Sequence, residues 1–328
     1  MKQNLLLIDG SALLSIQYHA TLPDELKKGD DPKFYPLIRK NKYGVYNNAI
    51  AGFFRVFGEM IKVTKATAAA VTFDIGTETL RKQACPTYKA NRSERPYPLK
   101  MQTDILRTSL REIGVPVYTS DLYEGDDVIA TIADKMKKSF DNICILTGDR
   151  DYFQLVGNNI MFAMYIPSGR KQDALEADKA FRLYGNYFLY DLRRVHKDMG
   201  VFPWQVPDFK ALAGDTSDNI PGVKGIGDKS ADSLLSVYKT VEDVFTAMDG
   251  MTEEEFLTVL KNAGISRPGG VYNALKADDA KESSSQAKKL SKMYRNVPVG
   301  NMSPELLQLH IDKDKYNAFM EAFGLKVS

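Results

Sequence analysis

Three short apolar runs, each followed at once by an acidic residue or an acidic turn, constrain the fold more than any other feature. The runs cover residues 5–8, 69–73 and 143–146, and their unbroken apolar character is typical of strands buried on both faces. Helical patterns lie between them, at residues 48–62 and 126–138. This alternation predicts an open α/β sheet of parallel strands, whose active site is built by loops at the carboxyl ends of the strands.

Beyond Pro203 the strand signal fades, and short helical patterns with Gly- and Pro-rich joints follow. They cover residues 207–213, 229–239, 241–248 and 253–263. Residues 275–290 are polar and poor in large apolar groups, which predicts an exposed helix or a mobile connector. We therefore expect an α/β catalytic core at residues 1–203 and a helical region at residues 204–328.

The acidic residues at strand ends and helix starts form an ordered set. Its members are Asp9, Asp74, Glu124, Asp126, Asp127, Asp149, Asp151, Asp215 and Asp218. A turn or a helix cap would explain any one of them alone. Together they would repel one another unless cations neutralised them, and oxygen-only clusters suit Mg²⁺ or Mn²⁺. Two such ions ~3.5–4 Å apart suit phosphodiester hydrolysis, whereas three scattered histidines disfavour a zinc site.

The net charge of +2 is small, but the charges are unevenly distributed if these carboxylates gather at one site. Setting nine of the 42 acidic residues aside leaves 33 acidic against 44 basic residues. A chain that is acidic at one place and basic elsewhere suits a metal site within a polyanion-binding surface. A mixed, solvated surface without such segregation is the alternative.

Residues 81–100 form a basic segment directly after the strand that ends at Asp74. The segment holds six basic residues and one acid, Glu94, with two tyrosines interleaved. These are Arg81, Lys82, Lys89, Arg92, Arg95 and Lys100, with Tyr88 and Tyr97. Basic side chains meet phosphates and aromatic rings stack on unpaired bases, which predicts nucleic-acid contact over the acidic site. A solvated surface loop is the competing interpretation.

A glycine-rich stretch at residues 214–230 precedes the helical pattern at 229–239. It is not a P-loop, because Asp228 follows Gly227 where a lysine is needed, and the glycine spacing reverses the dinucleotide fingerprint. A glycine hairpin that opens a helix can hold a phosphate through backbone N–H groups without reading sequence. The candidate contacts are Gly222, Lys224, Gly225, Gly227 and Lys229. An ordinary helix–turn–helix corner without a ligand is the alternative.

Targeting and redox features are few. No apolar run approaches the ~18–20 residues of a membrane span, and the N-terminal apolar stretch is too short for a signal peptide. Two cysteines, Cys85 and Cys144, lie in different contexts, so reliance on disulfides is not expected. We therefore expect a cytoplasmic protein with no membrane partner.

The chain resembles the 5′ nucleases: the 5′-3′ exonuclease domain of bacterial DNA polymerase I, phage 5′ exonucleases and, more distantly, flap endonucleases. The strings that carry the resemblance run in the expected order over most of the chain. They are Leu7-Ile8-Asp9-Gly10-Ser11, Phe73-Asp74, Tyr88-Lys89-Ala90-Asn91-Arg92, Tyr123-Glu124-Gly125-Asp126-Asp127-Val128, Leu146-Thr147-Gly148-Asp149-Arg150-Asp151 and Ala213-Gly214-Asp215-Thr216-Ser217-Asp218-Asn219-Ile220-Pro221-Gly222.

The resemblance implies a PIN-like (resolvase-like) nuclease core with a helical arch at about residues 75–112 and a helix-hairpin-helix module at about 207–240. Lys89 and Arg92 match the basic pair of the arch. The remaining implied roles concern metals. One divalent-ion site is matched by Asp9, Asp74, Glu124 and Asp126. The second is matched, directly or through water, by Asp127, Asp149, Asp151, Asp215 and Asp218. The hairpin matches a segment in which family members hold K⁺.

Two stretches depart from the family pattern: a basic insertion at residues 19–43 and a longer segment at residues 160–203. No polymerase sequence follows, so we expect a free-standing nuclease. The implied activity is a structure-specific 5′-3′ exonuclease and flap endonuclease in replication or repair. Its expected partners are DNA with a 5′ flap or duplex end, an RNA/DNA hybrid, and a recruiting polymerase or single-strand-binding protein.

Three rival functions remain at this point. A branched-DNA-binding scaffold of the same fold would bind without cutting. A haloacid-dehalogenase-type phosphatase would need an acid where Ser11 stands. A PIN-type ribonuclease would seldom carry a glycine hairpin.

Overall fold

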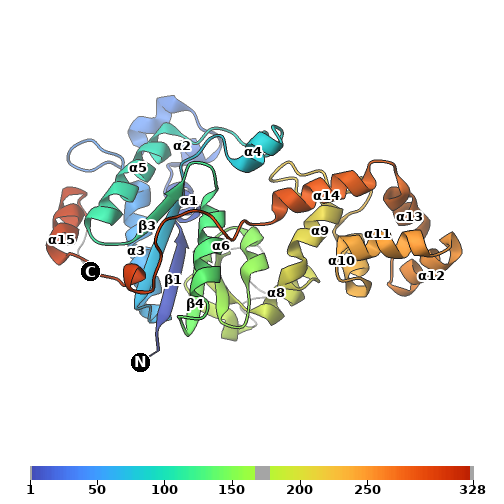
Figure 1. The fold of residues 1–328 in the computed structure, drawn as a ribbon. Helices are drawn as coiled ribbons and strands as arrows, with labels where there is room; N and C mark the ends of the chain where they lie inside the picture. Colours follow the sequence, from blue (N-terminus) through green and yellow to red (C-terminus); the bar gives the residue numbers. More distant parts are fainter. Residues whose placement is uncertain (1, 167–177, 326–328) are drawn as a thin grey trace.

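A seven-stranded sheet lies at the centre of the computed structural model, which describes residues 2–166 and 178–325 (Figure 1). The strand order is β3-β2-β1-β4-β5-β7-β6. The strands are β1 (Asn4–Asp9), β2 (Ala68–Asp74), β3 (Val117–Ser120), β4 (Asn142–Thr147), β5 (Ile160–Tyr165), β6 (Arg182–Tyr184) and β7 (Tyr187–Tyr190). The first five strands in this order, from β3 through β2, β1 and β4 to β5, are parallel. Strands β7 and β6 add an antiparallel edge. The predicted parallel α/β sheet is confirmed.

The three predicted apolar runs form the middle of this sheet, with β1 between β2 and β4. Leu7 lies opposite Ala70 on one side and Ile145 on the other. Because the three strands run in the same direction, their acidic ends meet at one edge of the sheet. The register therefore fixes where the candidate site is built.

Helices cover both faces of the sheet because alternate strand residues point to opposite faces. Leu6 and Ile8 pack with α1 (Gly10–Ala20), α3 (Asn48–Thr64) and α5 (Tyr97–Glu112), and Leu5 and Leu7 pack with α6 (Gly125–Met136). Shorter helical elements complete this part. They are α2 (Asp24–Lys27), η1 (Pro32–Leu37), α4 (Leu80–Ala84), η2 (Arg150–Leu155), η3 (Lys179–Phe181), α8 (Leu192–Met199) and η4 (Pro203–Gln205).

A helical extension follows and projects from the sheet domain (Figure 1). It contains α9 (Val206–Ala213), α10 (Asp228–Val237), α11 (Val241–Gly250), α12 (Glu253–Asn262), α13 (Pro268–Lys276) and α14 (Ala280–Ser291). Helix α14 packs along α9 with a buried stripe of small residues and one leucine: Ala280, Ser284, Ala287 and Leu290. The structure thus has a helix in the stretch 275–290, as one of the two predicted alternatives stated, but one face of it is buried because small side chains at helical spacing pack against α9.

The last part of the chain returns to the sheet domain. Residues 292–325 include η5 (Glu305–Leu307) and α15 (Lys313–Ala322). Leu309 N donates to Thr67 O beside β2, and the ring of Phe319 lies 5.3 Å from that of Phe54 on α3. The predicted helical region at 204–328 is thus corrected: its C-terminal part packs against the α/β core, because its aromatic side chains cover the exposed side of α3.

The two stretches that depart from the family pattern take different structures. Residues 19–43 contain α2 and η1, and residues 160–203 supply β5, the β6–β7 hairpin and α8. Residues 167–177 of the second stretch lie outside the described residues. Among the described helices, none is both long and apolar enough to cross a membrane.

Candidate active site at the carboxyl edge of the sheet

Asp9 ends β1 and caps helix α1 at the centre of the sheet edge. Its Oδ1 accepts a hydrogen bond from Ala12 N at 2.8 Å, and its Oδ2 accepts from the hydroxyls of Thr147 and Tyr152 at 3.1 and 3.2 Å. Burial and the neighbouring charge of Asp74 raise the pKa of Asp9 to about 6. A negative charge at Asp9 is therefore costly without a cation.

Asp74 ends the adjacent strand, β2, and connects it to α6 and to the basic segment. Its Oδ1 accepts from Gly125 N at 2.7 Å, and its Oδ2 accepts from the Arg95 guanidinium at 3.0 Å. Burial by itself would raise the pKa of Asp74, but the Arg95 guanidinium and the Gly125 N–H outweigh burial and lower that pKa. Sequence analysis assigned no specific role to Arg95, which the structure places beside this carboxylate.

The first turn of α6 brings Glu124 and Asp126 to the same edge. Glu124 is the N-cap residue of the helix, and Asp126 lies in its first turn. Acidic side chains are favoured at this end by the partial positive charge of the helix N-terminus. Burial and repulsion from Asp127 nevertheless raise the pKa of Asp126 well above its usual range.

Asp127 differs from the other predicted ligands because both of its carboxylate oxygens are bonded to a buried arginine. Its two carboxylate oxygens accept from the Arg81 guanidinium at 2.6 and 2.7 Å, and Oδ1 also accepts from Tyr294 N at 2.8 Å. Asp127 is 0% exposed and Arg81 is 3% exposed. Two expectations are corrected here: Asp127 is held in an ion pair, and Arg81 is not presented to DNA. The reason is that a buried charge requires a paired countercharge.

A second group of carboxylates gathers next to the first. Asp149 and Asp151 follow β4, and Asp215 and Asp218 come from the loop between α9 and α10. Asp151, Asp215 and Asp218 each offer an oxygen within 4.8 Å of the others. The four carboxylates predicted for the other site, Asp9 among them, are not gathered as closely in the described structure. Burial raises the pKa of Asp149, and the charges of Asp218 and Asp9 add to the effect.

Lys210 on α9 is a site residue that sequence analysis missed. Its Nζ is bonded to Asp151 Oδ1 and lies 2.6 Å from Asp215 Oδ2. Burial by itself would raise the pKa of Asp215, but the Lys210 ammonium outweighs burial and lowers that pKa to about 2. Burial and Asp149 raise the pKa of Asp151 to about 7 despite the same lysine. The sequence signal that could have revealed it was a lysine among the mostly apolar residues of α9.

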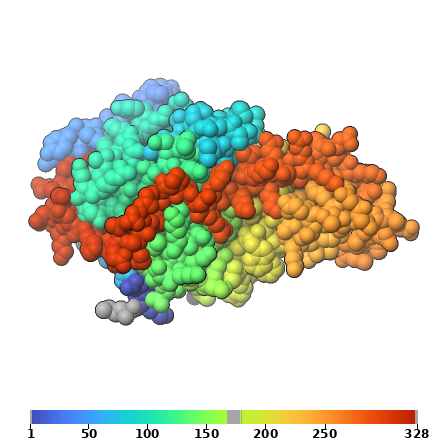
Figure 2. Space-filling model, in the orientation of Figure 1, coloured from blue at the N-terminus to red at the C-terminus, as the bar shows by residue number. Residues whose placement is uncertain are grey.

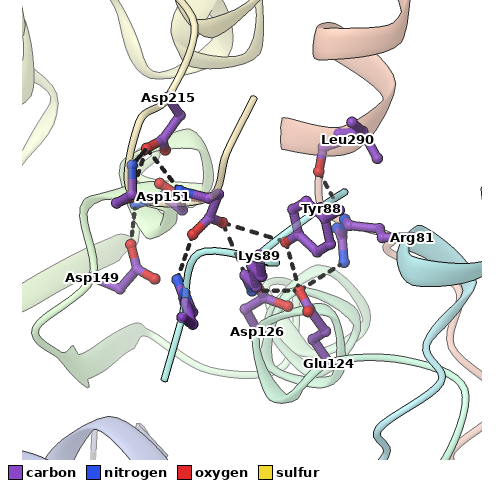
Figure 3. Close-up of polar contacts among 12 residues, drawn as sticks. Arg81, Tyr88, Lys89, Glu124, Asp126, Asp149, Asp151, Asp215 and Leu290 are labelled. Carbon is purple, nitrogen blue, oxygen red and sulfur yellow. Dashed lines mark hydrogen bonds and ion pairs between the residues drawn. The ribbon is translucent and has the colours of Figure 1, made fainter. Parts of the chain in front are cut away.

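Lys89 and Arg92 bring positive charge from the arch segment, residues 75–112, onto these carboxylates. Lys89 Nζ lies 2.9 Å from Glu124 Oε2 (Figure 3). It lies 3.7 Å from Asp218 Oδ2, and Arg92 is bonded to Asp218 Oδ1. The backbone of Lys89 has a φ of +55° and its N–H donates to Asp218 O at 2.9 Å. The arch segment is therefore attached directly to the loop between α9 and α10.

Tyr88 and Lys82 lie differently from what the sequence predicted. Tyr88 is 3% exposed, and its hydroxyl donates to Glu124 at 3.0 Å and to Asp218 at 3.3 Å. This burial corrects the expectation of an exposed stacking ring, since the hydroxyl is needed to satisfy two carboxylates. Lys82 remains half-buried, and its Nζ donates to Tyr88 O at 3.2 Å.

An open cavity of about 230 Å³ lies beneath the arch segment. Asp74 and Glu124 line it together with the basic side chains of Lys89, Arg92 and Arg95. We name it the arch cavity. Basic side chains paired with carboxylates beside a small open cavity suit a phosphate, which could replace a carboxylate as their partner.

The glycine hairpin connects α9 to α10 beside the second carboxylate group. Asp215 and Ile220 pair across it. Gly222 has a φ of +61°, and a Cβ on this residue would lie only 2.2 Å from Gly214 N, so no side chain fits there. Gly225, Gly227, Lys224 and Lys229 are exposed at the hairpin and the start of α10. The hairpin therefore presents backbone N–H groups and two lysines to the outside.

The chemistry of these side chains fits a divalent cation. The ligand atoms are carboxylate oxygens, which Mg²⁺ and Mn²⁺ prefer. Burial and mutual repulsion raise the pKa of several of them. These are Asp9, Asp126, Asp149 and Asp151. A bound cation would relieve that repulsion.

Comparison with known proteins agrees with this arrangement. A family model described as the 5′-3′ exonuclease N-terminal resolvase-like domain matches residues 4–185, and one described as the 5′-3′ exonuclease C-terminal SAM fold matches residues 201–315. A solved structure of the phage T5 D15 flap endonuclease, a pseudo-enzyme-product complex with DNA and metal ions, covers 98% of this chain. The TM-score is 0.54 at 19% identity, over 99% of that chain.

Two relatives illustrate the similarity in sequence. The 5′-3′ exonuclease of Bacillus subtilis (strain 168) is 34% identical over 238 residues, which are 73% of this chain and 71% of that protein. DNA polymerase I of Bacillus caldotenax is 29% identical over 326 residues, which are 99% of this chain but only 32% of that longer protein.

The fold and the acidic site define a resolvase-like α/β domain joined to a helical SAM-type module. The chain belongs to the 5′-3′ exonuclease family.

Proposed function

We propose that the protein is a metal-dependent, structure-specific 5′ nuclease that hydrolyses phosphodiester bonds in DNA. It combines 5′-3′ exonuclease and flap-endonuclease action and removes primers or flaps in replication or repair. The observation that carries the proposal is the arch cavity, where Glu124 and Asp74 face Lys89 and Arg92. Membership of the 5′-3′ exonuclease family supports the same assignment.

Two divalent cations, Mg²⁺ or Mn²⁺, are the proposed cofactors. Asp9, Asp74, Glu124 and Asp126 would hold one, and the other would lie among four carboxylates. These are Asp149, Asp151, Asp215 and Asp218. When bound, the cations supply an activated water and stabilise the leaving 3′ oxygen. The closeness of Asp151, Asp215 and Asp218 supports the second position.

Lys89 and Arg92 are the proposed phosphate-binding residues. Their side chains lie in the arch cavity and are bonded to Glu124 and Asp218. An incoming phosphate can replace a carboxylate as the partner of Lys89 and Arg92. These two side chains then hold the scissile phosphate against the acidic edge. They also stabilise the charge that develops on it in the transition state.

The glycine hairpin is the proposed duplex-binding element. Lys224 and Lys229 are exposed there, and the start of α10 offers free N–H groups to a backbone phosphate. Carbonyl oxygens of the same hairpin are a proposed K⁺ site. Replacing both lysines by glutamine should weaken duplex binding and reduce its salt dependence, as measured by fluorescence anisotropy across a salt series. Unchanged affinity and slope would refute the hairpin assignment.

The proposed biological setting is the bacterial or phage-infected cytoplasm, where the protein acts as a monomer on a 5′ flap or duplex end. A polymerase or single-strand-binding protein is a proposed recruiting partner, and an RNA/DNA hybrid is a further candidate substrate.

The decisive experiment is cleavage of a 5′-labelled flap duplex with Mg²⁺, with EDTA as one control and Asp126→Asn as another. We expect short 5′ products that require both the metal and Asp126, because that carboxylate lies at the acidic edge in the first turn of α6. Tight binding without products in Mg²⁺ and in Mn²⁺ would instead support a branched-DNA-binding scaffold.

A further inference from the structure

A second groove lies on the other side of α4, between that helix and the chain that leaves α14. It is lined by Arg81 and Ala84 on α4 and by residues 289–290 and 292–296, and its volume is about 590 Å³. Figure 2 shows the two segments, cyan and orange-red, meeting on the face that is drawn. We name this space the α4/α14 groove. Its size falls within the range of built ligand sites, roughly 300–1,000 Å³.

The ionisable lining of the α4/α14 groove is entirely cationic. Lys289, Lys292, Arg295 and Arg81 line it, and no carboxylate does so among the described residues. Arg81 is neutralised by Asp127, and Arg295 NH1 lies 3.9 Å from Asp134. Lys289 and Lys292 are exposed and have no ion-pair partner within the described part of the chain. Two free ammonium groups at a groove favour a polyanionic occupant.

An aromatic ring lies in the same groove and is held in place from two sides. The Arg81 guanidinium lies 5.1 Å from the centroid of the Tyr294 ring, and the ring of Tyr123 meets it edge-on at 5.2 Å. Tyr294 is half-buried and lines the groove. A fixed ring beside free lysines is the combination that binds unpaired nucleotides, whose bases stack while their phosphates pair with cations.

The α4/α14 groove adjoins the arch cavity. Helix α4 forms the wall between them: Lys82 faces the arch cavity, whereas Arg81 and Ala84 face the groove. The two tyrosines also meet across this wall, because Tyr123 lines the arch cavity and Tyr294 lines the groove. A strand that leaves the arch cavity past α4 therefore reaches the groove next.

We propose that the α4/α14 groove binds the single-stranded 5′ segment of the substrate, beyond the scissile phosphate, through Lys289, Lys292 and Tyr294. This inference rests on the proposed nuclease function and extends it by placing the displaced strand. An acidic segment of a partner protein is the other polyanion that could fit. The nucleic acid is favoured because the groove is next to the cavity where the strand would be cut.

The test compares binding of a flap duplex with a long 5′ single strand against the same duplex without a flap, measured by anisotropy in Ca²⁺. A Lys289→Gln/Lys292→Gln variant should bind the flap duplex more weakly, on the order of tenfold at about 0.1 M salt, because two phosphate contacts are lost. Its affinity for the flapless duplex should be unchanged. A Lys289→Arg/Lys292→Arg variant should restore flap binding.

The matched control is Lys135→Gln/Lys138→Gln, which removes two exposed charges with the same spacing near the far end of α6. It should change neither affinity. Equal weakening of both duplexes by the groove variant would show a general charge effect and overturn the proposal. No weakening of either would also overturn it and leave an acidic protein segment as the occupant to examine. If the wild type bound neither duplex, the proposed function itself would fail.

Discussion

At the scale of single residues, the buried pair of Arg81 and Asp127 connects several separate segments. Beyond the bidentate pair, Arg81 Nε donates to Leu290 O at 2.8 Å and NH2 donates to Lys292 O at 2.9 Å. NH1 also reaches Glu124 Oε2 at 3.2 Å. The guanidinium thus joins α4, the start of α6 and the end of α14, and it holds Glu124 at the acidic edge (Figure 3).

Replacing Arg81 by methionine should destabilise the protein by about 3–5 kcal/mol, because the Asp127 charge would remain buried without a partner. Denaturant unfolding would measure the change. The matched control is Arg107→Met, which breaks a pair with the largely exposed Asp104 on the surface of α5. That control should cost about 1 kcal/mol or less. Similar losses in the two variants would contradict the structural role given to Arg81.

Lys210 offers a second test at this scale, because its ammonium shares carboxylates with the proposed second cation. Replacing it by methionine removes a positive charge from Asp151 and Asp215. We expect Mn²⁺ to bind more tightly to the variant, by about tenfold, as measured by calorimetry in the absence of DNA. Weaker Mn²⁺ binding would mean that Lys210 orients the carboxylates more than it competes with the ion.

At the scale of elements, the hairpin between α9 and α10 depends on the close approach of two glycines. A Cβ on Gly222 would lie 2.2 Å from Gly214 N and 2.7 Å from Gly214 Cα. Both glycines also have positive φ values, of +61° and +77°. Neither the crossing nor the left-handed backbone tolerates a side chain.

Gly222→Ala should therefore destabilise the hairpin by about 1–3 kcal/mol and weaken duplex binding. Hydrogen exchange of the hairpin amides and anisotropy with a flapless duplex would measure the two effects. Gly250→Ala is the control, because a Cβ there meets nothing within 4 Å and its φ is not in the left-handed region. Unaltered exchange in Gly222→Ala would show that the crossing is not tight in solution.

At the scale of the whole molecule, the gathering of carboxylates makes stability depend on pH and on metal. The folded state raises the pKa of Asp9 from 3.8 to about 6 and that of Asp151 to about 7. Folding therefore favours their protonated forms. That contribution is complete below their ordinary pKa and is lost as the pH rises through about 6–7.

We expect the metal-free protein to lose about 4 kcal/mol of stability from these two groups between about pH 5 and pH 8. Thermal unfolding at several pH values would measure the loss. Mn²⁺ should raise the melting temperature most at the upper end of this range, where the carboxylates are ionised. An Asp9→Asn/Asp151→Asn variant should show a flatter pH profile. A metal-free wild type that gained stability over the same range would contradict the assignment.

The sequence anticipated the sheet and most of its acidic edge for a simple reason. Residues 5–8, 69–73 and 143–146 are almost wholly apolar, and their short length favours a buried strand over a helix. The carboxylates that follow them must then share an edge. The strands β3, β5, β6 and β7 were not anticipated. Strands β3, β6 and β7 hold half-polar or aromatic residues that acquire a strand environment only beside the central strands, and β5 is apolar but is not followed by an acidic turn.

What the sequence determined by itself was therefore the fold class, the edge that carries the carboxylates, and the glycine hairpin. These depend on local patterns of apolar, acidic and glycine residues. Only the tertiary structure decided that Arg81 and Tyr88 turn inward, that Lys210 joins the second carboxylate group, and that residues 292–325 return to the core. Each of these depends on contacts between distant segments, where the free energy of pairing a buried charge or covering an apolar face outweighs local preference.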